Sequence, residues 1–390
     1  MEIRKLLICL FVLIICLRVT AQDNPSRWTV EDVVKQTSVS SPQFSPDGNS
    51  LIWVHRRPSK KKDRFVNDLW LTRLDALKGQ KWPSIQLTRS EDSDNSPHFS
   101  ADGERIYFLS SRKGGKTLWA MSVYGGEAFA VDSFPAGISS VRWLDDNTLT
   151  FVASEGKTLR EQELKKKKDN VVVVEDSAHM SVRRIFTYDL KKKTVRRLTD
   201  NQFPVSSYAV SKDGNWLVSR HIRSPHYASD GKPEPWYFLW DLKKGTKEQI
   251  LAGYQDPSSY EFTADKSGFY FRATQSSLPE WGGAGISLLY FFNLESKTAS
   301  QIDLDWDWGL SGGYRLWGND LFLQLANGPT NKMIHLKKEA DAWRLNPVDV
   351  GSLTDRCNVM AVSKDGKQVA FAYSTASVPT QFRVGRIAQG

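Results

Sequence analysis

Cysteine is scarce in this chain of 390 residues, which has three of them. Cys9 and Cys16 lie in the apolar segment at the N-terminus, so Cys357 has no second cysteine to pair with in the rest of the chain. A fold held together by disulfides is therefore excluded, and a packed core must supply the stability. The composition allows such a core, because 40% of the residues are hydrophobic and 12% are aromatic, too many for a disordered chain.

Long apolar runs are also few. The longest, at residues 6–17, is shorter than the roughly 20 residues needed to cross a bilayer. It follows Arg4 and Lys5 and precedes Val19-Thr20-Ala21, an order typical of a secretory signal that is cleaved before Gln22. The sequence predicts a signal peptide over 1–21, export to the periplasm, cell surface or medium, and no membrane attachment after cleavage. A retained anchor is the alternative.

Charge of one sign is not strongly in excess, since the formal net charge is +9 at neutral pH. Lysines cluster at 60–62, 165–168 and 191–193, and each cluster falls in a segment expected to connect two strands. Such clusters favour solubility and are typical of solvated loop tips. We expect no nucleic-acid partner.

One repeated pattern dominates the chain, and it is clearest at residues 41–54 and 96–109. Each copy has an alternating apolar strand, a tight turn in which Asp-Gly supplies positive φ angles, and a second strand of β-branched and aromatic residues. Seven copies are present, with turns at positions 48, 103, 147, 214, 268, 320 and 366.

Each hairpin is followed by a further pair of expected strands, for example 69–74 and 85–88 after the first copy. Four strands every 44 to 67 residues fit propeller blades, which repeat at about 40–50 residues, and the longest interval holds an expected loop at 155–169. A single blade cannot bury both faces, so seven should close into a ring whose innermost strands line a central channel. The sequence predicts an all-β fold, a seven-bladed β-propeller of four-stranded antiparallel blades over residues 22–390.

Two motifs connect this pattern to a known family. The stretch 28–34 contains Trp-Thr-Val-Glu-Asp-Val and predicts a short helix capped by Thr29, and 41–48 reads Ser-Pro-Gln-Phe-Ser-Pro-Asp-Gly; Leu-Trp, Gln-Leu-Thr and Tyr-Asp-Leu follow in later strands. Together they resemble the N-terminal propeller of prolyl oligopeptidase family serine peptidases, above all the acylaminoacyl peptidase and exported bacterial dipeptidyl peptidase branch. The resemblance covers about residues 28–385.

That resemblance implies a propeller that caps the active site of a hydrolase and filters peptides by size. Its expected partners are a peptide substrate and a hydrolase domain or protein. TolB-like periplasmic propellers share the Pro-Asp-Gly repeats, so a free-standing protein-binding propeller is the alternative function.

In the peptidase family an α/β-hydrolase domain with Ser, Asp and His follows the propeller. This sequence ends at Gly390 without the alternating strands and helices of such a domain. We therefore expect no catalytic domain on this chain, no catalytic residues, and no cofactor or metal site. The chain alone is expected to hydrolyse nothing.

One segment imitates a nucleophile elbow, because Gly309-Leu310-Ser311-Gly312-Gly313 matches the pattern G-x-S-x-G. An elbow requires a buried strand before the serine and a helix after it. Here the preceding segment carries charge at alternate positions, and the following segment reads as strands. His335 is the only histidine downstream, and Asp320 falls in an expected turn. We expect Ser311 to lie in a loop and not in an active site.

The other histidines lie in different repeats without the spacing of metal ligands, and we expect them to be structural: His55, His98, His179, His221 and His226.

Two loops remain as candidate sites. Asp303, Asp305 and Asp307 could act as the paired carboxylates of a propeller glycosidase, but their alternation fits a charged loop equally well. The polar, proline-rich stretch 224–236 predicts a rim loop, and rim loops carry recognition or serve only as structure.

Overall fold

The computed structural model describes residues 29–74, 83–112, 114–155, 164, 166–168, 181–278, 285–339, 342–375 and 378–387. The predicted signal peptide 1–21 and most of the expected loop 155–169 lie outside these residues. Helical segments in the described part are α2 (Val30–Val34), α4 (Tyr227–Asp230) and the 3-10 segment η3 (Gly351–Arg356). None of the helices within these ranges has the length and apolar character needed to cross a membrane.

The strands form seven antiparallel sheets, which we call blades 1 to 7 in chain order. The blades are β1 (Ser38–Phe44), β2 (Ser50–Ser59), β3 (Arg64–Arg73) and β4 (Ser84–Gln86); β5 (Asp94–Phe99), β6 (Arg105–Ser110), β7 (Thr117–Ser122) and β8 (Phe129–Ala130); β9 (Ser139–Trp143), β10 (Thr148–Ser154), β11 (Arg183–Asp189) and β12 (Thr194–Arg197); β13 (Val205–Val210), β14 (Trp216–His221), β15 (Trp236–Asp241) and β16 (Thr246–Ile250); β17 (Gln255–Phe262), β18 (Gly268–Gln275), β19 (Ile286–Asn293) and β20 (Ala299–Gln301); β21 (Leu310–Trp317), β22 (Asp320–Asn327), β23 (Thr330–Glu339) and β24 (Ala342–Pro347); β25 (Cys357–Val362), β26 (Gln368–Tyr373) and β27 (Gln381–Arg386).

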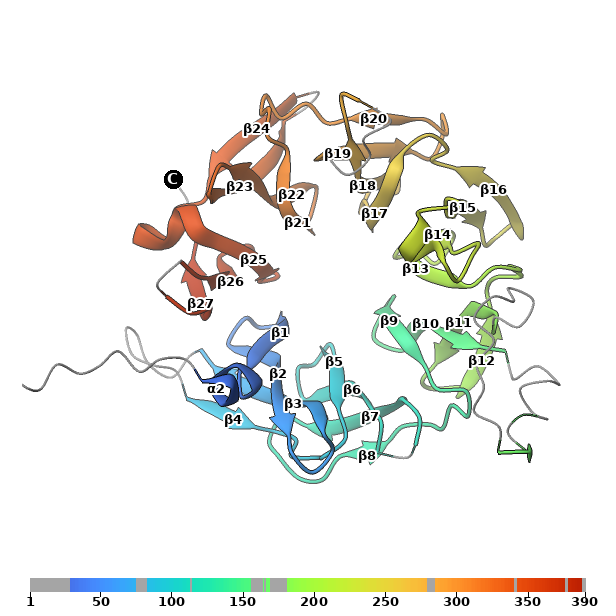
Figure 1. The fold of residues 1–390 in the computed structure, drawn as a ribbon, viewed down its shortest axis with the longest axis vertical. Helices are drawn as coiled ribbons and strands as arrows, with labels where there is room; N and C mark the ends of the chain where they lie inside the picture. The colour runs from blue at the N-terminus through green and yellow to red at the C-terminus, as the bar shows by residue number, and fades with distance from the viewer. Residues whose placement is uncertain are drawn as a thin grey trace, which may run out of the picture.

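The blades follow one another around a ring, with the first strand of each blade nearest the centre (Figure 1). The prediction of a seven-bladed propeller is therefore confirmed. Blade 7 differs in one respect, because its sheet has three strands in the described part of the chain, whereas the other six have four.

The turns between first and second strands lie on one face of the ring, which we call the turn face. Gly48, Gly103, Gly214 and Gly366 have φ angles of 75°, 74°, 70° and 70°, as predicted for Asp-Gly turns. In blade 5 the prediction was wrong by two residues. Lys266, with φ 64°, takes the place of the turn glycine, and Gly268 begins β18.

In blade 6 the prediction was also wrong by two residues, whereas in blade 3 the predicted Asn147 does lie in the turn. In blade 6 the positive φ belongs to Gly318, at 60°, and Asp320 already begins β22. In blade 3, Asn147 closes the turn through its N–H, which donates to Asp145 Oδ1 (2.7 Å). A side-chain hydrogen bond there replaces the glycine.

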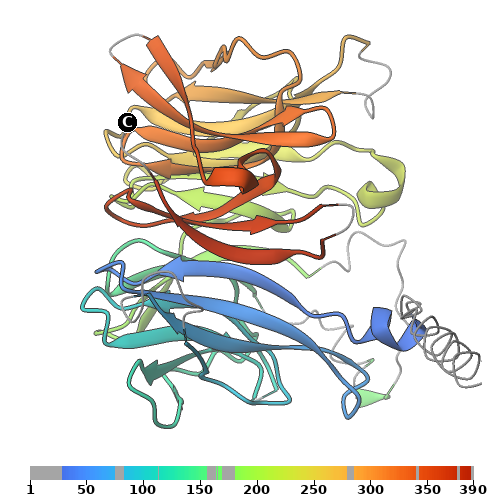
Figure 2. The same ribbon diagram turned by 90° about the vertical axis from the view of Figure 1, so that its left-hand side faces the viewer.

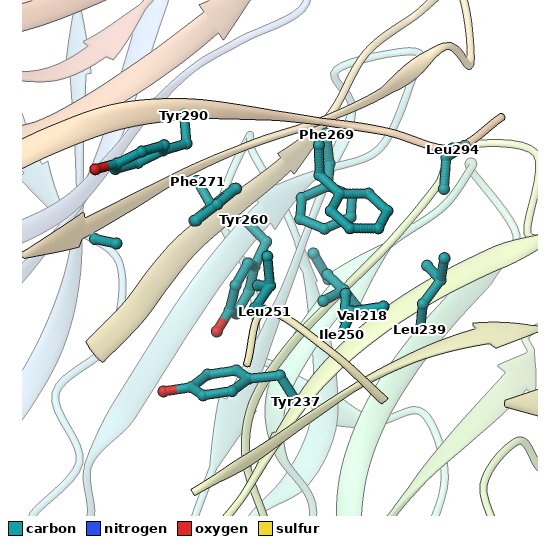
Figure 3. Close-up of a cluster of buried hydrophobic side chains, with 13 residues drawn as sticks. Val218, Tyr237, Leu239, Ile250, Leu251, Tyr260, Phe269, Phe271, Tyr290 and Leu294 are labelled. Atoms are coloured by element: carbon teal, nitrogen blue, oxygen red, sulfur yellow. The ribbon is translucent and has the colours of Figure 1, made fainter. Parts of the chain in front are cut away.

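The core lies between neighbouring blades, because each sheet buries one face against the next. Figure 3 shows 13 buried side chains between blades 4 and 5. Phe269 is fully buried there and stacks on Phe292 with ring centroids 4.9 Å apart. Aromatic side chains of this size contribute most of the apolar area that such an interface removes from water.

The seam between blades 7 and 1 is packed much less completely, and Figure 2 shows these two sheets facing each other. Three residues form its buried cluster, Phe44, Leu51 and Ala370. A side-chain hydrogen bond from Gln368 Nε2 to the carbonyl of Gly48 (3.0 Å) crosses the seam at the turn face. Beside the cluster lies an apolar cavity of about 940 Å³, lined by Trp53, Trp70, Met360, Phe382 and other side chains of both blades.

The predicted lead-in helix is confirmed as α2. Thr29 Oγ1 accepts a hydrogen bond from Asp32 N–H (3.2 Å), and Asp32 Oδ2 accepts one from Thr29 N–H (2.9 Å). This reciprocal pair is a capping box, which satisfies two free backbone donors at the start of the helix. Figure 2 shows α2 on the face of the ring opposite the turn face.

Candidate binding channel

The centre of the ring is lined by one side chain from each innermost strand at the same place in the repeat. That place is two residues before the residue that opens the turn. It is occupied by Gln43, His98, Arg142, Ala209, Glu261, Arg315 and Ala361. These seven side chains therefore line the channel with a mixture of neutral, basic and acidic groups.

A β-bulge in every innermost strand brings these side chains to the channel. The pairing register between first and second strands shifts in all seven blades. In four of the bulges a serine has a positive φ: 50° at Ser41, 51° at Ser96, 52° at Ser140 and 59° at Ser259. Because an extra residue reverses the alternation of side chains, the bulge decides which residues face the channel.

Several of these side chains hold the next blade in place. Gln43 Oε1 accepts a hydrogen bond from Phe99 N–H (3.2 Å) in blade 2. Its amide nitrogen lies 3.0 Å from His98 Nδ1, and the His98 ring stacks on Trp143 of blade 3 at 4.5 Å. Burial lowers the pKa of His98 to about 4, so its ring is neutral near pH 7.

Glu261 plays a similar part between blades 5 and 6. Its Oε2 accepts a hydrogen bond from the N–H of Leu316 (2.8 Å). Burial raises the pKa of the Glu261 carboxyl, whereas the Leu316 hydrogen bond and the nearby Arg315 and Arg142 act in the opposite direction. Arg315 in turn donates from Nε to the carbonyl of Met360 (3.2 Å) in blade 7.

Two cavities occupy the channel. One, of about 900 Å³, opens at the turn face among Gln43, Arg315, Lys364 and their neighbours. The other, of about 580 Å³, lies across the channel against the inner strands of blades 1 to 6. Its lining includes Arg142, Lys212 and Glu261 together with Trp143, Phe262 and Leu316. The channel can therefore offer charged groups beside apolar walls.

Sequence reasoning did not single out Arg142, Lys212 or Glu261. Alignment of the seven repeats would have placed Arg142 and Glu261 in one column, which is the signal that could have found them. Their exposure to the channel depends on the bulges, and serines at positive φ have no comparable sequence signature.

Ser311 does not belong to a nucleophile elbow. It lies exposed in β21, which continues to Trp317 and turns into β22, so a strand and not a helix follows it. His335 Nε2 does lie 2.9 Å from Asp320 Oδ2, but the strand register places this pair at the other end of the sheet from Ser311. The structure does not bring the three residues together as a catalytic triad, and Ser311 lies in a strand where a loop was predicted.

The three aspartates Asp303, Asp305 and Asp307 are exposed in the connection between β20 and β21. Asp303 Oδ1 accepts a hydrogen bond from Asp305 N–H (2.9 Å), which organises the loop. None of the three lines either channel cavity. The geometry fits the charged loop better than a pair of catalytic carboxylates.

The histidines are scattered as predicted, although His179 lies outside the described residues. The part of the chain that the structure describes contains no group of three His, Cys, Asp or Glu side chains able to hold a metal ion. His221 is buried in blade 4, where its ring nitrogens lie 2.7 Å from Ser219 Oγ and 3.1 Å from the Phe203 carbonyl. Lysines 60–62 and 191–193 fall in turns between strands, as expected.

The rim loop 224–236 contains α4 and is tied down by polar contacts. Tyr227 donates its hydroxyl hydrogen to Asp256 Oδ1 (2.9 Å) of blade 5, and the Arg220 guanidinium lies 5.3 Å from the Tyr227 ring. The Arg223 guanidinium lies 4.3 Å from the ring of Trp236. These contacts give the loop a structural role between blades 4 and 5.

No protein-family model matches the chain. Among curated proteins it is similar to the uncharacterized peptidase YuxL of Bacillus subtilis (strain 168), with 27% identity over 228 residues. The match covers 54% of this chain and 33% of that protein, so the chain spans about a third of its relative.

Solved structures with the same fold include an acylaminoacyl peptidase in complex with Z-Gly-Gly-Phe-chloromethyl ketone, with a TM-score of 0.61 and 14% identity. The match covers 92% of this chain and 52% of that one. The β-propeller domain of the Trilobed protease from Pyrococcus furiosus, described as having an open velcro topology, matches with a TM-score of 0.56 and 15% identity. This second match covers 90% of this chain and 94% of the Trilobed protease domain. The chain thus resembles the propeller domains of peptidases, as its motifs predicted.

Proposed function

We propose that this chain is the non-catalytic propeller part of an exported serine peptidase, and that its channel binds or gates peptide substrates. The observation that supports this most directly is the similarity to a peptidase along more than half of the chain. The described part of the chain is a ring of blades, so a nucleophile would have to come from a hydrolase domain or partner. Export rests on the signal-like segment 1–21.

The channel has the features that such a role requires. Its cavities combine apolar walls with a few charged side chains, which is the usual composition of a site for a small flexible ligand. Inner-strand side chains fix one blade to the next, so the channel is pre-formed and a peptide does not have to order it on binding.

Peptide binding tests the proposal. A peptide of about ten residues with an N-terminal dansyl group, which is neutral, should raise its fluorescence anisotropy on titration with the purified chain. The same sequence embedded in a small folded domain should not bind, because a channel admits extended chains only. Binding of folded envelope proteins without binding of peptides would contradict the proposal and favour the TolB-like alternative.

The absence of catalysis is tested separately. The purified chain should give no turnover of aminoacyl or dipeptidyl chromogenic substrates, since Ser311 lies far along the sheet from the His335–Asp320 pair. Turnover that is abolished by a serine-directed inhibitor would overturn this part of the proposal. The coding sequence after codon 390 should continue into an α/β-hydrolase domain, or a hydrolase should be encoded separately.

A further inference from the structure

The smaller channel cavity holds two cationic side chains that the protein itself does not use. The Arg142 guanidinium is exposed and forms no hydrogen bond or ion pair with any residue that the structure describes. The Lys212 ammonium is also exposed and has no hydrogen bond or ion pair within the described ranges. Both line the cavity of about 580 Å³, on the side of the channel where blades 3 and 4 lie.

Another arginine of the channel gives a contrast. Arg315 donates to the carbonyl of Met360 (3.2 Å) and, through its terminal nitrogen, to the carbonyl of Tyr314 (2.8 Å). Its position is therefore explained by the structure of the ring. Arg142 occupies the equivalent place in blade 3 without such a partner, so its donors are available to a ligand.

The acidic group in the cavity does not cancel these charges. Glu261 lies too far from Arg142 for an ion pair, and one of its carboxylate oxygens already accepts the N–H of Leu316 (2.8 Å). His98, which borders the same cavity, is neutral near pH 7 because burial lowers its pKa to about 4. Two unpaired cations thus face one engaged carboxylate, and the cavity favours an anion.

The walls indicate that the anion has apolar neighbours. Trp143, Phe262 and Leu316 line the same cavity and can cover an apolar side chain beside the charged group. A planar guanidinium with five donors suits a carboxylate, which it can bind through two parallel hydrogen bonds.

We propose that this cavity binds a peptide carboxylate, with Arg142 as its main ligand, Lys212 as the second cation, and Trp143 and Phe262 against the adjoining side chain. The inference rests on the peptide binding proposed above and names the chemistry of the peptides that are retained. The carboxylate can be the free C-terminus of a peptide or the side chain of an internal Asp or Glu.

Three versions of one apolar dansyl peptide separate these sources. The first has a free C-terminus, the second is C-terminally amidated, and the third is amidated with one internal aspartate. We expect the amide without an aspartate to bind about tenfold more weakly than the better of the two acidic peptides, the loss usual for one charge-assisted hydrogen-bonded contact. The acidic peptide that binds better identifies the source, and its affinity should fall as salt is added.

Charge-removing variants locate the site. In Arg142→Gln the acidic peptides should bind as weakly as the amide binds to the unchanged protein, and Arg142→Lys should restore part of the difference. Arg142 makes no contact that folding depends on, so these variants should fold normally. Arg196→Gln is the matched control, because it removes an exposed arginine from the outer strand β12 of the same blade. It should leave all three affinities unchanged.

Three results would overturn the inference. Equal binding of the acidic and amidated peptides would show that the cavity does not recognise a carboxylate, while the proposed peptide binding would still stand. Equal weakening by Arg142→Gln and Arg196→Gln would reduce the effect to general attraction by a basic protein. Failure of all three peptides to bind would end both this inference and the proposed function.

Discussion

At the level of single residues, the fold keeps two histidines neutral where water would let them ionise. Burial lowers the pKa of His98 to about 4, and it lowers the pKa of His221 to about 4 despite the Phe203 carbonyl near the ring. In the unfolded chain a histidine titrates near pH 6.5. Both residues therefore link stability to pH.

Acidification below about pH 6.5 should destabilise the protein through these two histidines. Between pH 6.5 and 4 the unfolded chain binds protons that the folded protein does not, so the free energy of unfolding falls as the pH falls, and His221 ceases to contribute to the change below pH 4. His221→Gln, which keeps hydrogen-bonding groups at a site that is 1% exposed, should reduce this fall by up to about 3 kcal/mol. Urea denaturation at several pH values measures it. An unchanged dependence on pH in the variant would show that folding does not lower the pKa of His221.

Single residues also mark the limit of prediction from sequence. Hydrophobic alternation predicted the innermost strands, but Ser41, Ser96 and Ser140 break the alternation at a positive φ. After such a bulge the other set of side chains faces the channel, so Arg142 and Glu261 could not be assigned to it from periodicity. The absence of a nucleophile elbow at Ser311 was predictable, because the motif lacked the buried strand before it and the helix after it that an elbow needs.

At the level of elements, the turn face repeats one hydrogen-bonded arrangement. In blade 4, Ser211 donates its hydroxyl to Asp213 Oδ1 (2.6 Å), which also accepts the N–H of Asn215 (3.1 Å), while Lys266 of blade 5 lies 3.3 Å from the other oxygen. Burial acts to raise the pKa of Asp213, but these partners outweigh it and lower the pKa to about 2. The sequence predicted the Asp-Gly turn but not that its carboxylate would bind the next blade.

The Asp213 turn should weaken only at low pH. Its carboxyl is ionised in the fold down to about pH 2 and in the unfolded chain to about pH 4, so its contribution is complete above pH 4 and disappears as the pH falls towards 2. Asp213→Asn keeps the acceptor for Ser211 and Asn215 and removes the charge. The variant should lose less stability than the unchanged protein between pH 4 and 2, measured by thermal unfolding. A steeper loss would contradict the lowered pKa.

Tyrosines join neighbouring blades at the bulges. Tyr208 of blade 4 is 2% exposed and donates its hydroxyl to the carbonyl of Ser140 (2.7 Å) in blade 3, while the hydroxyl of Thr150 lies 3.0 Å away. Tyr208→Phe leaves these groups without that partner and should lower the free energy of unfolding by about 1–3 kcal/mol. Tyr124→Phe is the matched control, because Tyr124 is 79% exposed and should change stability by less than about 0.5 kcal/mol. If urea denaturation shows equal effects for the two variants, the hydrogen bond from Tyr208 to Ser140 does not contribute to stability.

At the level of the whole molecule, repetition made the fold predictable. Seven turn signals at blade spacing were enough to give the number of blades and their order around the ring. How well each pair of neighbouring blades packs was not predictable in the same way, because the repeats are alike in sequence pattern and only their side-chain packing distinguishes one interface from another. Blades 4 and 5 share 13 buried side chains, whereas three form the cluster between blades 7 and 1.

Blade 7 should therefore be the first part of the ring to open. Its middle strand β26 is hydrogen-bonded to a strand on each side, as β18 is in blade 5. A difference in amide exchange rate between β26 and β18 therefore reports opening of the blade, because neither strand lies at the edge of its sheet. Amides of β26 should exchange with solvent faster than those of β18 in native-state hydrogen exchange followed by mass spectrometry. Gln368→Ala, which removes the hydrogen bond to Gly48, should speed exchange in β26 and β1 and leave β18 unchanged. Equal protection of β26 and β18 would mean that the apolar contacts of three buried residues suffice to close the ring.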